Sequence, residues 1–345
     1  MNTELYLVSQ EKSLLEALRQ INDLPGEPLV LFAVDKEGRM TGTLTDGDIR
    51  RGMLSGISME NPVSAMMHRD FKFLRQSHLD VADIKRYREN RILFIPVLDD
   101  EGRIVDAVNL VKGRSLLPMD AVLMAGGKGE RLRPLTDNTP KPLLPVGDKC
   151  IIDHNVDRLI SYGVRDIRVS VHYLASQLEE HFAQPRDGVK VQCLREEEYL
   201  GTIGAVRQMP AFPDDTVLVM NSDLFTNIDF EDFYLHFKEN DADLSVAAVP
   251  YNVSIPLGIL DLEGRDVKGV VEKPVYNYYA CAGMYLMKRS VIEEIPANAF
   301  FHATDLVQKL ADKGRKVIRY PMNGTWIDIG TLREYQKACD LVKHL

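Results

Sequence analysis

Cysteine and tryptophan are scarce in this 345-residue sequence, which contains four cysteines and one tryptophan. The cysteines, at positions 150, 193, 281 and 339, form no CxxC pair and have none of the spacings of a zinc site, so we interpret them as reduced core residues. No apolar run approaches the roughly 20 residues that cross a bilayer, and the N-terminus has no charged leader followed by a long apolar segment. These absences predict a cytoplasmic protein with no membrane partner.

Positive charge is also in deficit. The 42 Lys and Arg residues are outnumbered by 51 Asp and Glu residues, which gives a net charge of −9 and argues against a nucleic-acid partner bound by a general basic field. The length is sufficient for two domains, each with its own core. Residues 124–142, MAGGKGERLRPLTDNTPKP, are an exception to the acidic balance, because they combine three glycines and three prolines with several lysines and arginines.

The first third of the chain contains an internal repeat. Residues 34–42, VDKEGRMTG, match residues 98–106, LDDEGRIVD, at an offset of 64 residues. In each copy the pattern predicts an amphipathic helix, an apolar strand, an acidic turn that ends in glycine, and a second strand. We therefore expect a pseudo-symmetric α+β module over residues 1–118, with a boundary near Pro118.

Residues 42–51, GTLTDGDIRR, resemble the end of a cystathionine-β-synthase (CBS) motif, so residues 1–118 resemble a tandem CBS pair. Thr45 and Asp48 would then bind a regulatory adenine or guanine nucleotide, since a carboxylate can accept both ribose hydroxyls and a helix start suits phosphate. The second copy has Asn109 and Lys112 at the matching positions and lacks the carboxylate. The alternative is a packing or dimerisation module in which Asp48 only caps a helix.

From residue 119 to residue 345, short runs of Val, Ile and Leu alternate with helical patterns. Strands without polar alternation are buried on both faces, so the pattern predicts an α/β domain with a Rossmann-like, mostly parallel sheet. Ligands bind beyond the carboxyl ends of such strands, and residues 124–142 follow one of them. This segment is neither a Walker loop nor a GxGxxG loop, but its glycine amides and cations suit a triphosphate.

Two segments carry a second family resemblance. Residues 123–136, LMAGGKGERLRPLT, and residues 139–149, TPKPLLPVGDK, resemble the signature of the sugar-nucleotide pyrophosphorylases. These are nucleotidyltransferases with a GT-A-like fold, which join a nucleoside triphosphate (NTP) to a sugar 1-phosphate and release pyrophosphate. The resemblance extends over residues 120–340 and implies the same activity here.

The resemblance implies a role for each matching residue. Asp223, at the end of a predicted strand, and Asp328, in WIDIGT, would bind the cofactor Mg²⁺. The residues implied in catalysis are Arg131, Lys141, Asp223 and Lys273, and those implied in nucleotide binding are Ala125, Gly126, Gly127, Gly129, Gly201 and Thr202.

The sugar site is implied by the segment VEKP, in which Glu272 would contact the sugar hydroxyls and Lys273 the sugar phosphate. Gly258 and Gly283 would complete this site. Many relatives have a tyrosine before the first of these glycines, whereas this chain has Leu257, which leaves the preferred hexose open.

A CBS pair ahead of such a domain resembles the arrangement of bacterial guanylyltransferases that act on glucosamine 1-phosphate in legionaminic acid pathways. This favours GTP and an amino sugar, with mannose-1-phosphate guanylyltransferases or other NDP-hexose pyrophosphorylases as the alternative. A regulatory pseudoenzyme would have lost the loop, Lys141 or Asp223, and a glycosyltransferase would have a DxD motif where residues 221–223 read NSD. The CBS pair also predicts a homo-oligomer, most simply a dimer.

Overall fold

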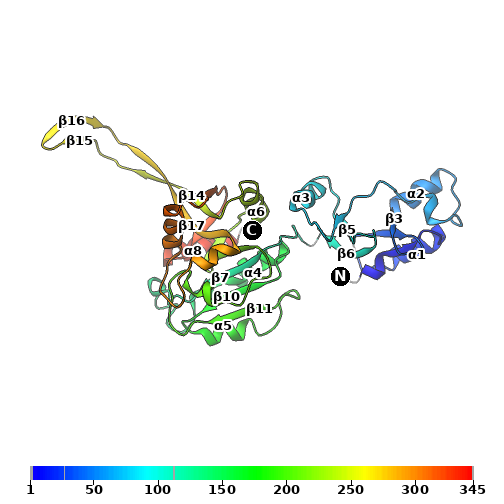
Figure 1. The fold of residues 1–345 in the computed structure, drawn as a ribbon, viewed down its shortest axis with the longest axis horizontal. Helices are drawn as coiled ribbons and strands as arrows, with labels where there is room; N and C mark the ends of the chain where they lie inside the picture. The colour runs from blue at the N-terminus through cyan, green and yellow to red at the C-terminus, as the bar shows by residue number, and fades with distance from the viewer. Residues whose placement is uncertain (1–2, 27, 112, 344–345) are drawn as a thin grey trace. The chain divides into compact units, whose positions relative to one another are not determined.

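The structure is a computed structural model that describes residues 3–26, 28–111 and 113–343. The chain divides into two compact units, Met1–Leu116 and Leu117–Leu345, two residues before the boundary expected from the sequence (Figure 1). Each unit has its own clusters of buried apolar residues. Among the described residues, no helix combines the length and the apolar composition needed to cross a membrane.

The first unit consists of two similar halves. The first contains η1 (Thr3–Tyr6), β1 (Leu7–Ser9), α1 (Leu14–Asn22), β2 (Val30–Val34), β3 (Met40–Thr45) and α2 (Asp46–Leu54). The second contains η2 (Val63–Ala65), β4 (Leu74–Arg75), α3 (Val81–Glu89), β5 (Phe94–Leu98) and β6 (Ile104–Asn109). Each half has a three-stranded sheet, β1-β2-β3 or β4-β5-β6, in which the first pair is parallel and the second antiparallel.

The 64-residue repeat has a counterpart in the packing of this unit. Arg39 and Arg103, which are 64 residues apart, form an antiparallel bridge between the acidic turns of the two halves. The rings of Phe32 in β2 and Phe94 in β5 stack with centroids 5.0 Å apart. The two sheets therefore share one core, as a small CBS module requires. Lys112 lies outside the described residues.

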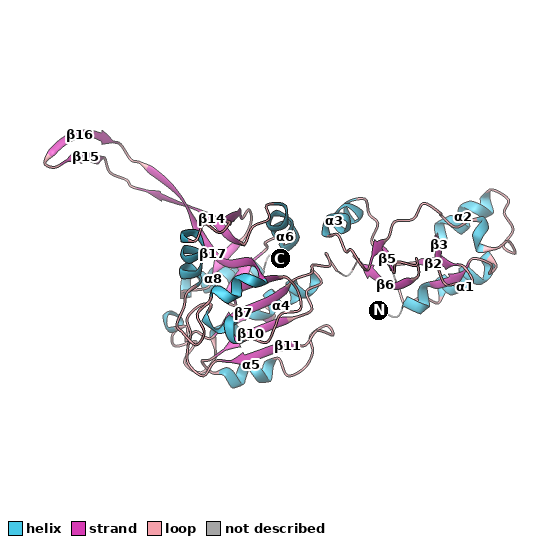
Figure 2. Cartoon of the chain, in the orientation of Figure 1, coloured by secondary structure: helices cyan, strands magenta, loops and turns pink. Residues whose placement is uncertain are grey.

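The second unit is built on a seven-stranded sheet with the order β11-β10-β7-β12-β17-β14-β18 (Figure 2). Only β17 runs against its neighbours, so the expected mostly parallel α/β fold is confirmed. The sheet strands are β7 (Asp120–Ala125), β10 (Ile167–Val171), β11 (Val191–Arg195), β12 (Thr216–Asn221), β14 (Leu244–Ser254), β17 (Val275–Lys288) and β18 (Val317–Pro321). All five residues of β10 and the first five of β12 are buried, because helices and loops cover both faces.

The helices and short strands of the second unit connect and cover this sheet. The helices are η3 (Glu130–Leu132), η4 (Lys141–Leu143), α4 (Ile151–Ser161), α5 (Ala175–His181), η5 (Gly204–Gln208), α6 (Phe230–Glu239), η6 (Arg289–Glu294), α7 (Ala303–Asp312) and α8 (Leu332–Val342). The short strands form the pairs β8 (Pro145–Val146) with β9 (Lys149–Cys150), β13 (Leu224–Thr226) with β19 (Trp326–Asp328), and β15 (Ile259–Glu263) with β16 (Asp266–Val271).

One part of the second unit projects from its body. Strands β14 and β17 stay paired beyond the sheet as far as Ser254 and Val275, and the hairpin β15–β16 continues outward from them (Figure 2). We call residues 250–279 the arm. Gly258, Glu272 and Lys273, which were expected in the sugar site, lie on this arm.

Candidate active site

The carboxyl ends of β7 and β12 border a pocket of about 130 Å³. It lies where ligands bind in open α/β sheets. Ser222 joins the two strand ends, because its hydroxyl donates to the carbonyl oxygen of Met124 at 2.7 Å. The pocket is lined by Met124, Ala125, Gly126, Gly127, Lys141, Pro142, Tyr199, Gly201, Thr202, Asn221, Ser222 and Asp223.

The glycines after β7 allow the backbone to approach its surroundings closely. A Cβ atom on Gly126 would lie 2.8 Å from Oε1 of Glu196, whereas one on Gly127 would meet nothing within 4 Å. Gly129 has a φ of 63° and its Cβ would lie 3.1 Å from Cβ of Lys141. The turn therefore needs glycine for two reasons, a left-handed conformation at one position and lack of space at another.

Lys141 and Asp223 form an ion pair in the pocket, in which Nζ donates to Oδ2. The two side chains are only 12% and 22% exposed. Lys141 opens η4 after Pro140, and Asp223 lies in the turn between β12 and β13. A lysine from the loop and an aspartate from a strand end are thus brought together across 82 residues of sequence.

Asp328 lies beside this pair because β19 pairs with β13. Asp328 is opposite Leu224 in the ladder, and the N–H of Ile329 donates to the carbonyl oxygen of Asp223 at 3.1 Å. Burial raises the pKa of Asp328, and the charge of Asp223 raises it further, while Lys141 and Arg131 lower it. Two carboxylates and two cations are therefore close enough to act on one another.

Arg131 and Asp328 both line a second groove, of about 890 Å³. A Cβ atom on Gly330 would be 3.2 Å from Nη2 of Arg131, so the guanidinium packs against the backbone after Asp328. The groove and the pocket together contain Arg131, Lys141, Asp223 and Asp328, which the sequence analysis selected as phosphate- and metal-binding residues.

The two carboxylates fit a divalent cation. Oδ1 of Asp223 is buried and has no hydrogen-bond partner among the described residues, although Oδ2 is paired with Lys141. A buried carboxylate oxygen without a partner is unfavourable unless a ligand satisfies it. Oxygen ligands from two aspartates are the set that Mg²⁺ prefers when substrate phosphates supply the others.

Gly201 and Thr202 line the pocket, and Gly283 lies behind one of its lining residues. Gly201 has a φ of 82°, and the hydroxyl of Thr202 accepts the N–H of Ala303 at 2.9 Å, so this threonine also holds the start of α7. A Cβ on Gly283 would lie 2.7 Å from Nδ2 of Asn221, which lines the pocket.

The other predicted sugar residues lie on the arm and do not join the pocket. Glu272 and Lys273 are 72% and 70% exposed, and Lys273 has a φ of 44°. Gly258 lies next to them, because its Cβ would be 3.0 Å from Oε2 of Glu272. The three residues thus form a cluster of their own at the inner end of the β15–β16 hairpin.

Sequence reasoning missed several residues of the site. Glu196 is buried beneath Gly126, where it accepts the hydroxyl of Ser170 and the N–H of Leu200. Tyr199 lines the pocket, and burial raises its pKa, followed by the charges of Glu196 and Asp223. The available signal was the run EEEYLGT, in which Glu196 and Tyr199 stand shortly before the predicted Gly201.

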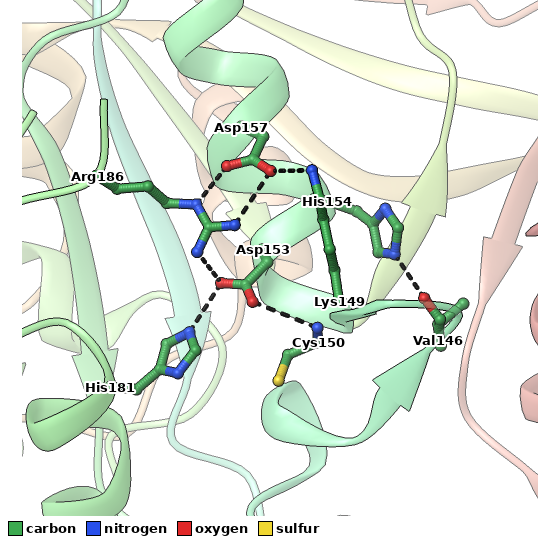
Figure 3. A network of polar contacts seen from close by, with 8 residues as sticks. All are labelled: Val146, Lys149, Cys150, Asp153, His154, Asp157, His181 and Arg186. Atoms are coloured by element: carbon green, nitrogen blue, oxygen red, sulfur yellow. Dashed lines mark hydrogen bonds and ion pairs between the residues drawn. The ribbon is translucent and has the colours of Figure 1, made fainter. Parts of the chain in front are cut away.

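A second cluster of titratable side chains at the start of α4 is occupied by ion pairs (Figure 3). Cys150, Asp153 and His181 lie close enough together to hold a metal ion. However, Oδ1 of Asp153 already contacts Nε2 of His181 at 2.8 Å and Nη1 of Arg186 at 2.9 Å. Arg186 also donates to Asp157. A cationic guanidinium within the cluster disfavours a metal. The contacts instead hold α4 against His181 at the end of α5 and Arg186 in the loop after α5.

In the first unit, Thr45 ends β3 and Asp48 lies in the first turn of α2, at the strand-to-helix junction expected from the CBS motif. They form a capping box in which the Asp48 carboxylate accepts the N–H and the hydroxyl of Thr45 at 2.8 and 2.6 Å. Arg51 also pairs with Asp48 at 2.6 Å. Both side chains thus have a structural role as helix caps.

Comparison with known proteins agrees with this fold. The protein resembles a mannose-1-phosphate guanylyltransferase catalytic subunit beta of Xenopus tropicalis, with 26% identity over 63% of this chain and 62% of the relative. It also resembles a glucose-1-phosphate adenylyltransferase of Bacillus cereus, with 28% identity over 63% of this chain and 66% of the relative. The chain therefore spans less than two thirds of the length of these relatives.

Among solved structures, HddC from Yersinia pseudotuberculosis complexed with GMP-PN superimposes with a TM-score of 0.50 and 25% identity, over 65% of this chain and 99% of that one. The CBS domain family matches residues 1–55. The nucleotidyl transferase family matches residues 120–344, which include every residue of the pocket. The chain therefore belongs to the nucleotidyl transferase family and has a CBS domain at its N-terminus.

Proposed function

We propose that this protein transfers a nucleotidyl group from a nucleoside triphosphate to a sugar 1-phosphate and releases pyrophosphate. The observation that carries the proposal is the meeting of Lys141, Asp223 and Asp328 beside the glycine turn. Two anionic reactants repel each other, so an enzyme of this kind must offset their charge and align them. Lys141, Arg131 and the glycine amides offer donors and positive charge for the triphosphate.

Each group has a task in this reaction. An oxygen of the sugar phosphate forms a bond to the α-phosphorus while the bond from that phosphorus to the departing pyrophosphate breaks. The N–H groups of Gly126 and Gly127, with Lys141 and Arg131, bind the triphosphate oxygens and stabilise the charge that develops. Mg²⁺, held by Asp223 and Asp328, would supply further positive charge at the phosphates.

We further propose GTP and glucosamine 1-phosphate, or a related hexosamine or hexose 1-phosphate, as the preferred substrates. The guanylyltransferase named among the relatives supports the base, and the CBS domain ahead of the catalytic unit supports the amino sugar. The adenylyltransferase relative makes ATP the first competitor to examine. For the first unit we propose a regulatory purine nucleotide beside Thr45 and Asp48, because the start of α2 can meet phosphate.

The test is a matrix of four nucleoside triphosphates against hexose and hexosamine 1-phosphates in Mg²⁺, with pyrophosphate release as the readout. We expect the fastest release with GTP and glucosamine 1-phosphate, and loss of that release when EDTA is added. A different best pair would correct only the base or the sugar. Absence of pyrophosphate with every pair would refute nucleotidyl transfer.

A further inference from the structure

The arm exposes an unusual amount of apolar surface. Of the 23 large hydrophobic side chains that are exposed among the described residues, twelve belong to the arm, which is less than a tenth of the chain. A two-stranded ribbon is marginal in water by itself, and a contiguous apolar surface of this kind marks an interaction site. The twelve residues are Tyr251, Val253, Leu257, Leu260, Leu262, Val267, Val270, Val271, Val275, Tyr276, Tyr278 and Tyr279.

The inner part of the arm has two unlike faces. Val253 is opposite Tyr276 and Tyr251 is opposite Tyr278, so these four side chains share one face. The next pair, Asn252 with Asn277, lies on the other face. The face with Tyr251 and Tyr278 is therefore apolar and aromatic, whereas the other face is mixed, because Asn252 and Asn277 lie between the pairs Pro250–Tyr279 and Ser254–Val275. A continuous apolar face on one side is the pattern of a strand pair that covers another surface.

While the arm is extended as in this structure, Glu272 and Lys273 do not reach the pocket of their own chain. Its strands continue two strands of the central sheet, and the pairing is unbroken from Ala248 and Cys281 to Ser254 and Val275. Lys273 is seven residues beyond Ala280, which is roughly 20 Å of extended chain. Folding back would break this ladder and leave its backbone groups without partners.

The pocket, in turn, needs what the arm carries. Lys141 is the single cation among the described residues that line it, and that lysine is already paired with Asp223. Arg131 lies in the groove with Asp328 and is assigned, with Lys141, to the triphosphate, so the sugar 1-phosphate still needs a cation and groups for its hydroxyls. Glu272 and Lys273 have this chemistry, and both are more than two thirds exposed.

The root of the arm borders the groove that contains Arg131 and Asp328, which is the position required if two copies exchange arms. Tyr251 lines the same groove as Arg131 and Asp328, so the arm starts beside the site that it would complete on another molecule. In a two-fold pair the same surface of each molecule faces the other, and an element that leaves one site can enter the equivalent site of the partner. A second copy of this chain is thus the occupant that fits the arm.

We propose that two copies exchange arms, so that Glu272 and Lys273 of one copy complete the sugar-phosphate part of the pocket of the other. This inference rests on the proposed function for its catalytic part. The apolar face with Val253 and Tyr276 packs on the body of the second copy, and the exchange makes each active site composite.

The first test measures self-association of the full-length protein by light scattering and sedimentation. The double variant Val253→Lys/Tyr276→Lys places charges on the apolar face, and we expect it to weaken self-association by at least about tenfold, because apolar burial is lost at both arms of the pair. The matched control Asn252→Lys/Asn277→Lys alters the neighbouring pair on the other face and should leave association unchanged. A wild-type monomer, or equal association of both variants, would overturn the exchange.

The second test uses two inactive variants of the same chain. Lys273→Ala alters the arm and Asp223→Asn alters the pocket, and each alone should release little pyrophosphate. When the two are refolded together, half of the pairs are mixed and each mixed pair has one intact site, so we expect about a quarter of the wild-type rate. Mixed pairs, verified by two affinity tags, without recovered activity would overturn the supply of Lys273 from a second copy.

The two tests separate this inference from the proposed function. If the wild-type protein releases no pyrophosphate with any substrate pair, nucleotidyl transfer fails, yet the light-scattering comparison still decides whether arms are exchanged. If the wild-type protein is active as a monomer, nucleotidyl transfer stands and the exchange fails.

Discussion

Asp223 combines two roles in one side chain. One carboxylate oxygen is paired with Lys141, and the other is buried without a hydrogen-bond partner among the described residues. Burying two charges costs desolvation free energy, and removing one of them leaves the other buried without a partner. A bound phosphate beside Lys141 and a bound cation beside Asp223 would offset that cost. This arrangement is typical of a site that is complete only with its ligands.

For this pair we predict that Lys141→Ala and Asp223→Asn each lower the rate of pyrophosphate release by on the order of 10²–10³-fold, because each removes a group that stabilises charge in the transition state. Circular dichroism should show a folded protein in both cases. Lys149→Ala is the matched control, since Lys149 pairs with Asp157 outside the pocket and should be dispensable for the reaction. A rate near that of the wild type for either pocket variant would remove that residue from the proposed mechanism.

Asp120, the first residue of β7, is buried with one carboxylate oxygen unpartnered among the described residues. Burial raises the pKa of Asp120 to about 6, and the charges of Asp214 and Asp166 contribute to this rise. The folded protein therefore binds this proton more tightly than the unfolded chain does. From about pH 4 to pH 6 the free energy of unfolding should fall as pH rises, by on the order of 3 kcal/mol for this group.

The corresponding prediction is that Asp120→Asn stabilises the second unit at pH 7 to 8 and removes most of this decline. Asparagine retains an oxygen that can accept the N–H of Asp214, which Asp120 accepts at 3.0 Å. Denaturant unfolding at several pH values measures the effect, with Asp215→Asn as the control because the Asp215 side chain is 85% exposed. Equal pH dependence in wild type and variant would show that Asp120 titrates normally.

Two short helices in the first unit begin in the same way. In α1 the capping box is formed by Ser13 and Glu16, and in α2 it is formed by Thr45 and Asp48. Both helices have nine residues and both begin with a capping box, so they can be compared directly. Only the second pair lies in the segment that resembles a nucleotide-binding motif. Comparing variants of the two capping boxes therefore distinguishes a structural role of Asp48 from a ligand-binding role.

We therefore predict that Asp48→Ala and Glu16→Ala each lower the unfolding midpoint of the first unit through loss of the cap. Only Asp48→Ala should also weaken binding of ATP or GTP to the first unit, as measured by calorimetry. Equal nucleotide binding in Asp48→Ala and wild type would limit Asp48 to helix capping.

At the scale of the whole molecule, the two units differ in what holds them together. The core of the first unit joins its two sheets through the stacked rings of Phe32 and Phe94. The second unit is organised around one seven-stranded sheet and has separate apolar clusters on it. Units with separate cores can unfold separately.

We predict that Phe32→Ala destabilises the first unit by about 3–5 kcal/mol, because it removes a fully buried ring and leaves a cavity. Hydrogen exchange followed by mass spectrometry should show lost protection in peptides from residues 3–111 and retained protection in those from residues 117–343. Met53→Ala is the control, since Met53 is 53% exposed. Equal loss of protection in both units would mean that they unfold together.

The local parts of this protein were predictable from the sequence. The 64-residue repeat, the alternation of apolar strands with helices, and the glycine turn after AVLMA all depend on residues that are close in the chain. They predicted the α/β fold, the CBS module and the glycine turn with its cations. Glu196 and Tyr199 were missed, because the run EEEYLGT places them near Gly201 in the sequence but does not show that they pack beneath and beside the glycine turn after AVLMA.

The sequence by itself determined which residue types are present and in which local conformations, since hydrophobic period, glycine and proline act over a few residues. Only the tertiary structure decided that Asp223 and Asp328, 105 residues apart, lie side by side, because the β13–β19 pairing brings them together. It also decided that Glu272 and Lys273 lie on an arm away from the pocket. Strand pairing is a non-local choice, so the sequence pattern of a strand does not specify where that strand leaves the sheet.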